Sequence, residues 1–144
     1  MTKTCKYVAL KNYIPQGLPS EDDFEIKTKE IKLNNKNNIH VLNSWISVDP
    51  YMRARMTERK NYKPPFNIGE EMEGYAIGTV EQSASDSFNK GDLVFNNNGM
   101  RDNFICNGKD LKKINSSNLP IQSYLGPLGM TGHTAYIGLF KYGK

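Results

Sequence analysis

The first segment with residue types suited to chemistry runs from residue 48 to 53 and is Val-Asp-Pro-Tyr-Met-Arg. Its candidate catalytic group is Tyr51. A phenol is neutral at pH 7, donates one hydrogen bond and has an apolar body, so it suits a substrate oxygen in a pocket. On residue type alone, two other roles are more common: packing of Tyr51 against the protein body, and capping of a helical turn by Asp49.

The second segment spans residues 125–136 and is Leu-Gly-Pro-Leu-Gly-Met-Thr-Gly-His-Thr-Ala-Tyr. Its glycines let the backbone approach a flat ring closely. The spacing is not the Gly-x-Gly-x-x-Gly of a dinucleotide-binding fingerprint, and no clear strand of a βαβ unit precedes it. From the residues alone, a simple loop before a helix is the more common interpretation.

Charged side chains gather in two further places. Glu70, Glu71 and Glu73 could act as an acid–base cluster, but we expect them to face solvent or to pair with arginines. Basic residues are densest from Arg53 to Lys63, where they could face nucleic-acid phosphates, although a solvated loop is more common. We expect Arg53 to hold its loop in place through carboxylate or carbonyl contacts.

Metal-ligand spacing is absent from the sequence. The candidates Cys5, Cys106, His40 and His133 form no Cys-x-x-Cys or His-x-x-His pattern, so we predict no zinc. Two cysteines far apart in a chain of this type are more often free and buried than disulfide-bonded.

Length and composition favour one globular domain. The chain has 144 residues, 38% of them hydrophobic and 24% charged, with a formal net charge of +4. No apolar run approaches the roughly 20 residues of a membrane helix, and the N-terminus has no signal-peptide pattern. We therefore expect a cytoplasmic protein with no membrane partner and no nucleic-acid partner.

Short β-like runs separated by Gly and Asn turns predict a mainly β domain with a C-terminal helix. The expected strands are residues 7–14, 24–32, 39–48, 74–81, 92–95, 103–106 and 111–114. The pattern of the second strand shifts before Ile31, which predicts a bulge. Residues 34–38 and 89–92 predict turns. The helix is expected over 133–142, with Thr131 as its cap and Gly143 near its end.

The stretch from Asp49 to Asn67 breaks the β pattern. Pro50 fits the first turn of a short helix with Asp49 as the N-cap. Pro64 and Pro65 then oppose regular structure. A loop of this length is uncommon in a compact domain and is more often functional.

The two segments, in this order, resemble the N-terminal half of a known enzyme family. This family is the zinc-independent medium-chain dehydrogenases/reductases of the leukotriene B4 12-hydroxydehydrogenase, prostaglandin reductase and NADP-dependent alkenal double-bond reductase type. The resemblance implies a GroES-like, partly open β-barrel over residues 1–128. Residues 129–144 would form the start of the helix that leads to a Rossmann domain. That domain is missing from the 144 residues. Zinc-dependent members of the superfamily have a histidine ligand where this chain has Glu70.

The resemblance also implies a reaction. NADPH would transfer a hydride to an α,β-unsaturated aldehyde or ketone and so reduce its C=C bond. Quinones are the other substrate class that the resemblance implies. Tyr51 would donate a hydrogen bond to the substrate oxygen, and Met130, Thr131 and Gly132 would contact the nicotinamide. The fragment alone would be inactive or nearly so.

Two further expectations follow. An apolar surface should be exposed near Met130 and Tyr136, where the missing Rossmann domain would pack, and a homodimer could form there. The alternative function is a non-catalytic GroES-like binding or scaffold domain left by gene truncation. A weaker alternative is nucleic-acid binding through the basic run from Arg53 to Lys63.

Overall fold

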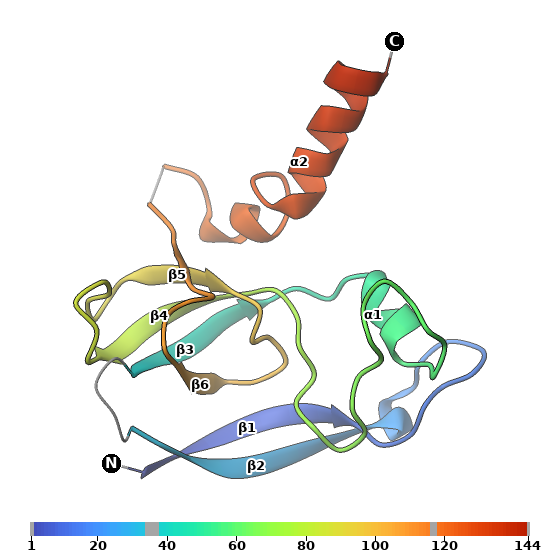
Figure 1. Ribbon diagram of the computed structural model, residues 1–144, viewed down its shortest axis with the longest axis horizontal. Helices are drawn as coiled ribbons and strands as arrows, with labels where there is room; N and C mark the ends of the chain where they lie inside the picture. Colours follow the sequence, from blue (N-terminus) through green and yellow to red (C-terminus); the bar gives the residue numbers. More distant parts are fainter. Residues whose placement is uncertain (1, 34–37, 116–117, 144) are drawn as a thin grey trace.

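The computed structural model describes residues 2–33, 38–115 and 118–143. Two antiparallel β layers form the body, and a C-terminal helix projects away from it (Figure 1). The prediction of a mainly β domain with a C-terminal helix is confirmed, and within the described residues the strands do not close into a complete barrel.

The first layer is a two-stranded ribbon of β1 (Thr2–Leu10) and β2 (Phe24–Lys32). Their antiparallel register runs without interruption, so the predicted bulge before Ile31 is wrong. No bulge is needed because Ile26 lies on the outer face and is 71% exposed, whereas Ile31 packs on the inner face. The first strand was expected over residues 7–14. It starts earlier because the side chains of Cys5 and Tyr7 already point inward. It ends at Leu10, before the loop that leads to the 3₁₀ turn Glu21–Asp23.

The second layer is a five-stranded antiparallel sheet in the order β6-β3-β4-β5-β7. The strands are β3 (Ile39–Ile46), β4 (Ala76–Ser83), β5 (Leu93–Asn96), β6 (Asn103–Cys106) and β7 (Lys112–Lys113). The predicted turn before β5 is confirmed, with Gly91 at a φ of 91° that favours glycine. The other predicted turn, residues 34–38, lies largely outside the described residues.

Two larger apolar clusters, and a smaller one on β1, form the core. One belongs to the five-stranded sheet and its connecting loops and contains Ile39, Val41, Val80, Phe88, Val94, Phe104 and Leu111. The other lies under the loop after β3 and contains Leu10, Ile14, Met52, Met56, Phe66 and Met72. Full burial of one such side chain contributes about 1.5–3 kcal/mol, so the second cluster anchors that loop.

That loop contains α1 (Tyr51–Arg55), as the sequence predicts, with Pro50 at its N-cap position. Asp49 does not cap the helix with its side chain, so that prediction is wrong. Its Oδ1 instead accepts a hydrogen bond from the Ser47 hydroxyl at 2.9 Å.

The C-terminal arm begins with the 3₁₀ turn Ile121–Leu125 and continues as α2 (Met130–Ile137) and a wider π-helical segment (Gly138–Tyr142). Gly129 is the N-cap residue, so the predicted cap at Thr131 is wrong. The Thr131 hydroxyl donates to the Gly126 carbonyl at 2.9 Å. Gly143 ends the helix as predicted. No described helix has the length and apolar character that a membrane span requires.

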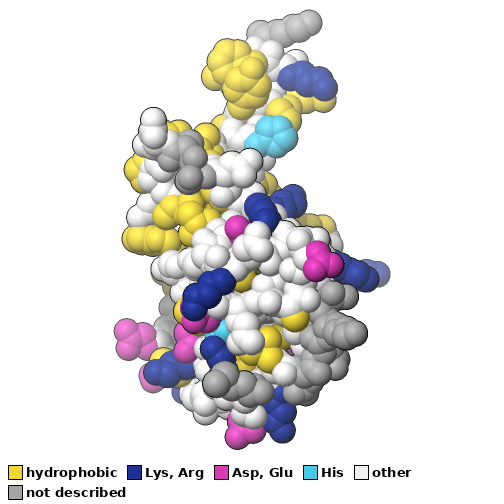
Figure 2. Space-filling view, turned by 90° about the vertical axis from the view of Figure 1, so that its left-hand side faces the viewer, with side chains coloured by type: hydrophobic (Ala, Val, Ile, Leu, Met, Phe, Trp, Pro, Cys, Tyr) yellow, Lys and Arg dark blue, Asp and Glu magenta, His cyan; other side chains and the backbone are white. Residues whose placement is uncertain are grey.

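The arm carries much of the exposed apolar surface. Met130 and Tyr136 are 51% and 63% exposed, which confirms the apolar surface expected near these two residues. In Figure 2, apolar side chains gather over the projecting arm, whereas the visible face of the body is mostly polar and charged, with smaller apolar spots.

Candidate functional site

Tyr75, just before β4, joins the two segments that the sequence singled out. Its ring packs edge-on against Tyr51, with centroids 6.2 Å apart and an interplanar angle of 60°. Its hydroxyl lies 3.4 Å from the sulfur of Met130, to which it donates. The loop around α1 and the start of α2 therefore meet at one aromatic side chain. Tyr75 was not predicted as a site residue, because a tyrosine at the start of a strand has no spacing that indicates a chemical role.

The hydroxyl of Tyr51 is shielded from solvent and has no hydrogen-bond partner among the described residues. Burial, and to a smaller extent the nearby Asp49 carboxylate, raise the pKa of this phenol to about 12. The Lys63 ammonium lies 5.6 Å from the Tyr51 ring centroid. Tyr51 is thus a protonated donor at neutral pH. An unpaired buried donor costs about 1–3 kcal/mol, which a ligand oxygen would relieve.

Met130, Thr131 and Gly132 do not contribute equally to the site. Met130 is half-exposed and reaches Tyr75 through its sulfur. The Thr131 hydroxyl is already bonded to the backbone within the turn. A Cβ on Gly132 would lie 1.9 Å from the Pro127 carbonyl oxygen, so this glycine is required for close packing of the turn. Only Met130 presents its side chain to the other site residues.

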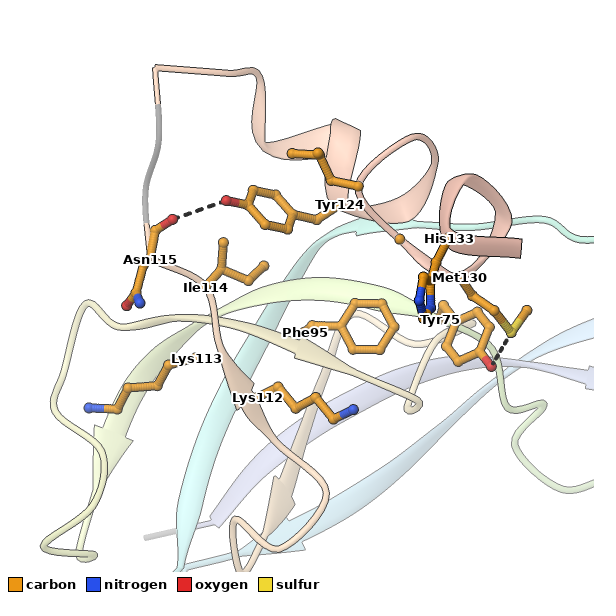
Figure 3. A pocket seen from close by; sticks show the side chains of 11 residues that line it. Tyr75, Phe95, Lys112, Lys113, Ile114, Asn115, Tyr124, Met130 and His133 are labelled. Atoms are coloured by element: carbon orange, nitrogen blue, oxygen red, sulfur yellow. Dashed lines mark hydrogen bonds between the residues drawn. The ribbon is translucent and has the colours of Figure 1, made fainter. Parts of the chain in front are cut away.

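A groove of about 740 Å³ lies between the β5–β7 edge of the sheet and the base of the arm (Figure 3). Its floor holds the rings of Tyr75 and Phe95, which are 5.3 Å apart and tilted by 33°. Lys112 and Ile114 come from the sheet side, and Met130 and His133 come from α2. A flat apolar molecule could stack on these rings, next to the hydrogen-bond donors of Lys112 and His133.

Arg53, two residues after Tyr51 in α1, already has a hydrogen-bond partner. Its Nε and Nη2 donate to the Gly17 carbonyl at 3.0 and 2.8 Å, which confirms the prediction that it holds its loop in place. This contact commits two of the Arg53 N–H donors to the protein's own backbone.

The three carboxylates of the predicted acidic cluster are also occupied. Glu73 pairs with the buried Arg55 at 3.0 Å, and Glu71 pairs with Arg101 at 3.7 Å. Glu70 accepts a hydrogen bond from a neighbouring asparagine side chain at 2.6 Å. The expectation that these glutamates pair with arginines or face solvent is confirmed, since Glu71 and Glu73 pair with arginines and Glu70 is exposed.

The candidate metal ligands do not come together. Cys5 and Cys106 are free, as predicted, and burial raises the pKa of both thiols. His40 is buried and its Nε2 lies 3.1 Å from the Asn103 side-chain oxygen, while burial lowers its pKa. Within residues 2–33, 38–115 and 118–143, no three His, Cys, Asp or Glu side chains are placed to hold a metal ion.

A family model described as the N-terminal domain of oxidoreductase matches residues 6–114. Among similar proteins, the 2-alkenal reductase (NADP⁺-dependent) of Nicotiana tabacum is 41% identical over 141 residues, covering 94% of this chain and 41% of the relative. The NADPH-dependent curcumin reductase of Escherichia coli (strain K12) is 33% identical over 130 residues, covering 90% of this chain and 38% of the relative.

A solved structure agrees with these matches. CurA from Vibrio vulnificus in complex with NADPH superimposes with a TM-score of 0.83 at 31% identity, covering 94% of this chain and 40% of that chain. The present chain therefore spans about two fifths of the length of the relatives that it matches.

Proposed function

Because the chain belongs to the family of oxidoreductase N-terminal domains of the medium-chain dehydrogenases/reductases, we propose that it forms the substrate-side wall of an active cleft. The reaction is NADPH-dependent reduction of the C=C bond of α,β-unsaturated aldehydes or ketones, or of quinones. The observation that carries this proposal is the line of contacts from Tyr51 through Tyr75 to Met130. It brings a free phenolic donor and a candidate cofactor contact to the same region.

Tyr51 is the catalytic donor in this proposal. NADPH, when bound, supplies the hydride for the β-carbon of the substrate. As the hydride arrives, negative charge develops on the substrate oxygen, and a donor at that oxygen lowers the barrier. A proton from solvent then reaches the α-carbon and completes the reduction. The high pKa of Tyr51, about 12, keeps the proton on the phenol, so it donates throughout the physiological pH range.

Met130 gives the nicotinamide an apolar contact surface, since its side chain is half-exposed beside Tyr75. The roles of Thr131 and Gly132 are indirect. The bond from Thr131 to Gly126 and the close approach of Gly132 to Pro127 fix the turn that presents Met130.

The same proposal assigns residues 1–128 to a GroES-like substrate-side domain and residues 129–144 to the start of a helix that leads to a cofactor-binding domain. The exposed apolar side chains of α2 support packing against such a domain or against a second copy. We further propose that zinc takes no part in the reaction, that the protein acts in the cytoplasm, and that these 144 residues alone are inactive or nearly so.

The test is NADPH oxidation by the native gene product, purified from its own cells and sized by intact mass. We expect a native protein of more than twice the mass of the 144-residue chain that oxidises NADPH in the presence of trans-but-2-enal. The 144-residue chain alone should show no turnover. A native product that binds no NADPH and reduces no enal, enone or quinone would favour the alternative of a non-catalytic scaffold domain.

A further inference from the structure

The strand register places two aromatic rings and one lysine on the same face of the sheet. Phe95 of β5 is paired with Ile77 on one side and with Lys112 of β7 on the other. Directly paired residues point to the same face, and so does Tyr75, which lies two positions before Ile77. The groove floor therefore consists of a two-ring aromatic surface with an ammonium group at its edge.

The charge on this face is not compensated. Lys113 lies opposite Val94 and points the other way, and its ammonium lies 2.7 Å from the Asp92 carboxylate. In Figure 3 the two lysine side chains extend in opposite directions. Lys112 makes no ion pair within the described part of the chain, and no Asp or Glu lines the groove. A bound anion would pair with Lys112 and would meet no carboxylate there.

The opposite wall supplies one apolar and one polar group. Met130 and His133, both from the first turn of α2, face the groove across from the sheet (Figure 3). His133 has an exposed imidazole that can donate a hydrogen bond in either tautomer. A ligand in the groove would therefore be sandwiched between aromatic rings and a thioether, with donors at its edge.

We propose that the groove binds a flat conjugated molecule that carries an anionic group, a carboxylate or a phosphate. Tyr75 and Phe95 stack on the conjugated part, and Lys112 pairs with the anion. This inference rests on the proposed function and predicts that, within its substrate class, conjugated carbonyl compounds with an acidic substituent bind more tightly than neutral ones. Lys112 is then the residue that sets specificity for acidic over neutral substrates.

The test is a titration of the ¹⁵N-labelled 144-residue chain, followed by amide chemical shifts, with trans-cinnamate and with the neutral isostere trans-cinnamamide. We expect cinnamate to shift the Phe95, Lys112 and His133 resonances and to bind about fivefold more tightly than the amide, as expected for one partly exposed ion pair. Phenyl phosphate, titrated in parallel, distinguishes the two anions, and the tighter ligand identifies the group that the site prefers.

Matched variants locate the charge effect. K112Q should abolish the preference for cinnamate over cinnamamide, and K112R should retain it. K109Q removes the same charge from an exposed lysine outside the groove, and it should leave the preference unchanged.

The proposal is wrong if cinnamate and cinnamamide bind equally, or if K112Q and K109Q behave alike. It is also wrong if NADPH, and not cinnamate or phenyl phosphate, shifts these resonances, because the groove is then a cofactor surface. Turnover of enals by the native gene product does not enter this experiment. A failed titration would therefore leave the reductase proposal standing, and failed turnover would leave the groove result standing.

Discussion

The hydroxyl of Tyr75 lies 3.4 Å from the sulfur of Met130, across 55 residues of sequence. On its other side, the Tyr75 ring packs edge-on against Tyr51. Tyr75 therefore couples the loop after β3 to the base of α2. Its hydroxyl and its ring make separate contacts, so substitutions can distinguish the two contributions.

Replacing Tyr75 should separate stacking from hydrogen bonding. Y75L removes the ring contacts with Tyr51 and Phe95, each of which contributes about 0.5–1.5 kcal/mol beyond area burial. We expect Y75L to lower the free energy of unfolding by roughly 1–3 kcal/mol. Y75F keeps the rings and should cost less than about 1 kcal/mol. Urea denaturation measures both.

The control for this pair is Y62L, because Tyr62 is 78% exposed and has no ring contact among the described residues. It should change the free energy of unfolding by less than about 0.5 kcal/mol. Equal effects of Y75F and Y75L would show that the aromatic contacts do not stabilise the fold.

The Tyr51 hydroxyl should be neutral or unfavourable for stability but necessary for catalysis. Since it is buried without a partner, Y51F removes an unsatisfied donor and should leave the free energy of unfolding unchanged or raise it. In the native gene product, the same change should lower kcat for enal reduction about 10²-fold, as for other oxyanion donors. A Y51F enzyme with lower stability and full activity would assign Tyr51 a purely structural role.

Tyr51 also gives a pH dependence with a definite sign. Its folded pKa of about 12 lies above the ordinary value of 10.0. The folded state therefore holds this proton more tightly, and folding stability falls as the pH rises from about 10 to about 12. The phenolate absorbance of the wild type minus that of Y51F should show one tyrosine that titrates near pH 12. A difference curve centred at pH 10 would contradict the burial of this hydroxyl.

Gly132 and Gly138 provide a matched pair on the same arm. A Cβ at position 132 would collide with the Pro127 carbonyl oxygen at 1.9 Å, whereas a Cβ at position 138 meets nothing within 4 Å. G132A should displace the turn and lower the helical signal of the arm in far-ultraviolet circular dichroism. G138A should raise that signal, because alanine is favoured over glycine by up to about 1 kcal/mol in a helix. The opposite order would contradict the packing of the turn.

The local elements could be predicted from the sequence wherever neighbouring residues determine them. The strands β2 and β6 have the predicted bounds, because a turn or a polar run delimits each of them. The helix caps were wrong at Asp49 and Thr131. In both cases the side chain bonds to a different nearby group, Ser47 or Gly126, and residue type does not reveal this choice.

The site was predictable only in part, for a related reason. Tyr51 and Met130 lie in segments whose sequences resemble those of the family, but Tyr75, which contacts both, does not. The position of Tyr75 depends on where β4 lies relative to both segments, which is a property of the tertiary fold. The uncompensated charge of Lys112 likewise depends on a strand register that places Lys113, and not Lys112, near Asp92.

Hydride transfer to carbon is the central claim, and isotope labelling tests it most directly. The native gene product should be incubated with trans-but-2-enal and NADPH deuterated at C4 of the nicotinamide, and the product analysed by NMR. The account predicts butanal with deuterium at the β-carbon, and a Y51F enzyme that forms the same product more slowly. Deuterium at the carbonyl carbon of an unsaturated alcohol, or no labelled product, would contradict it.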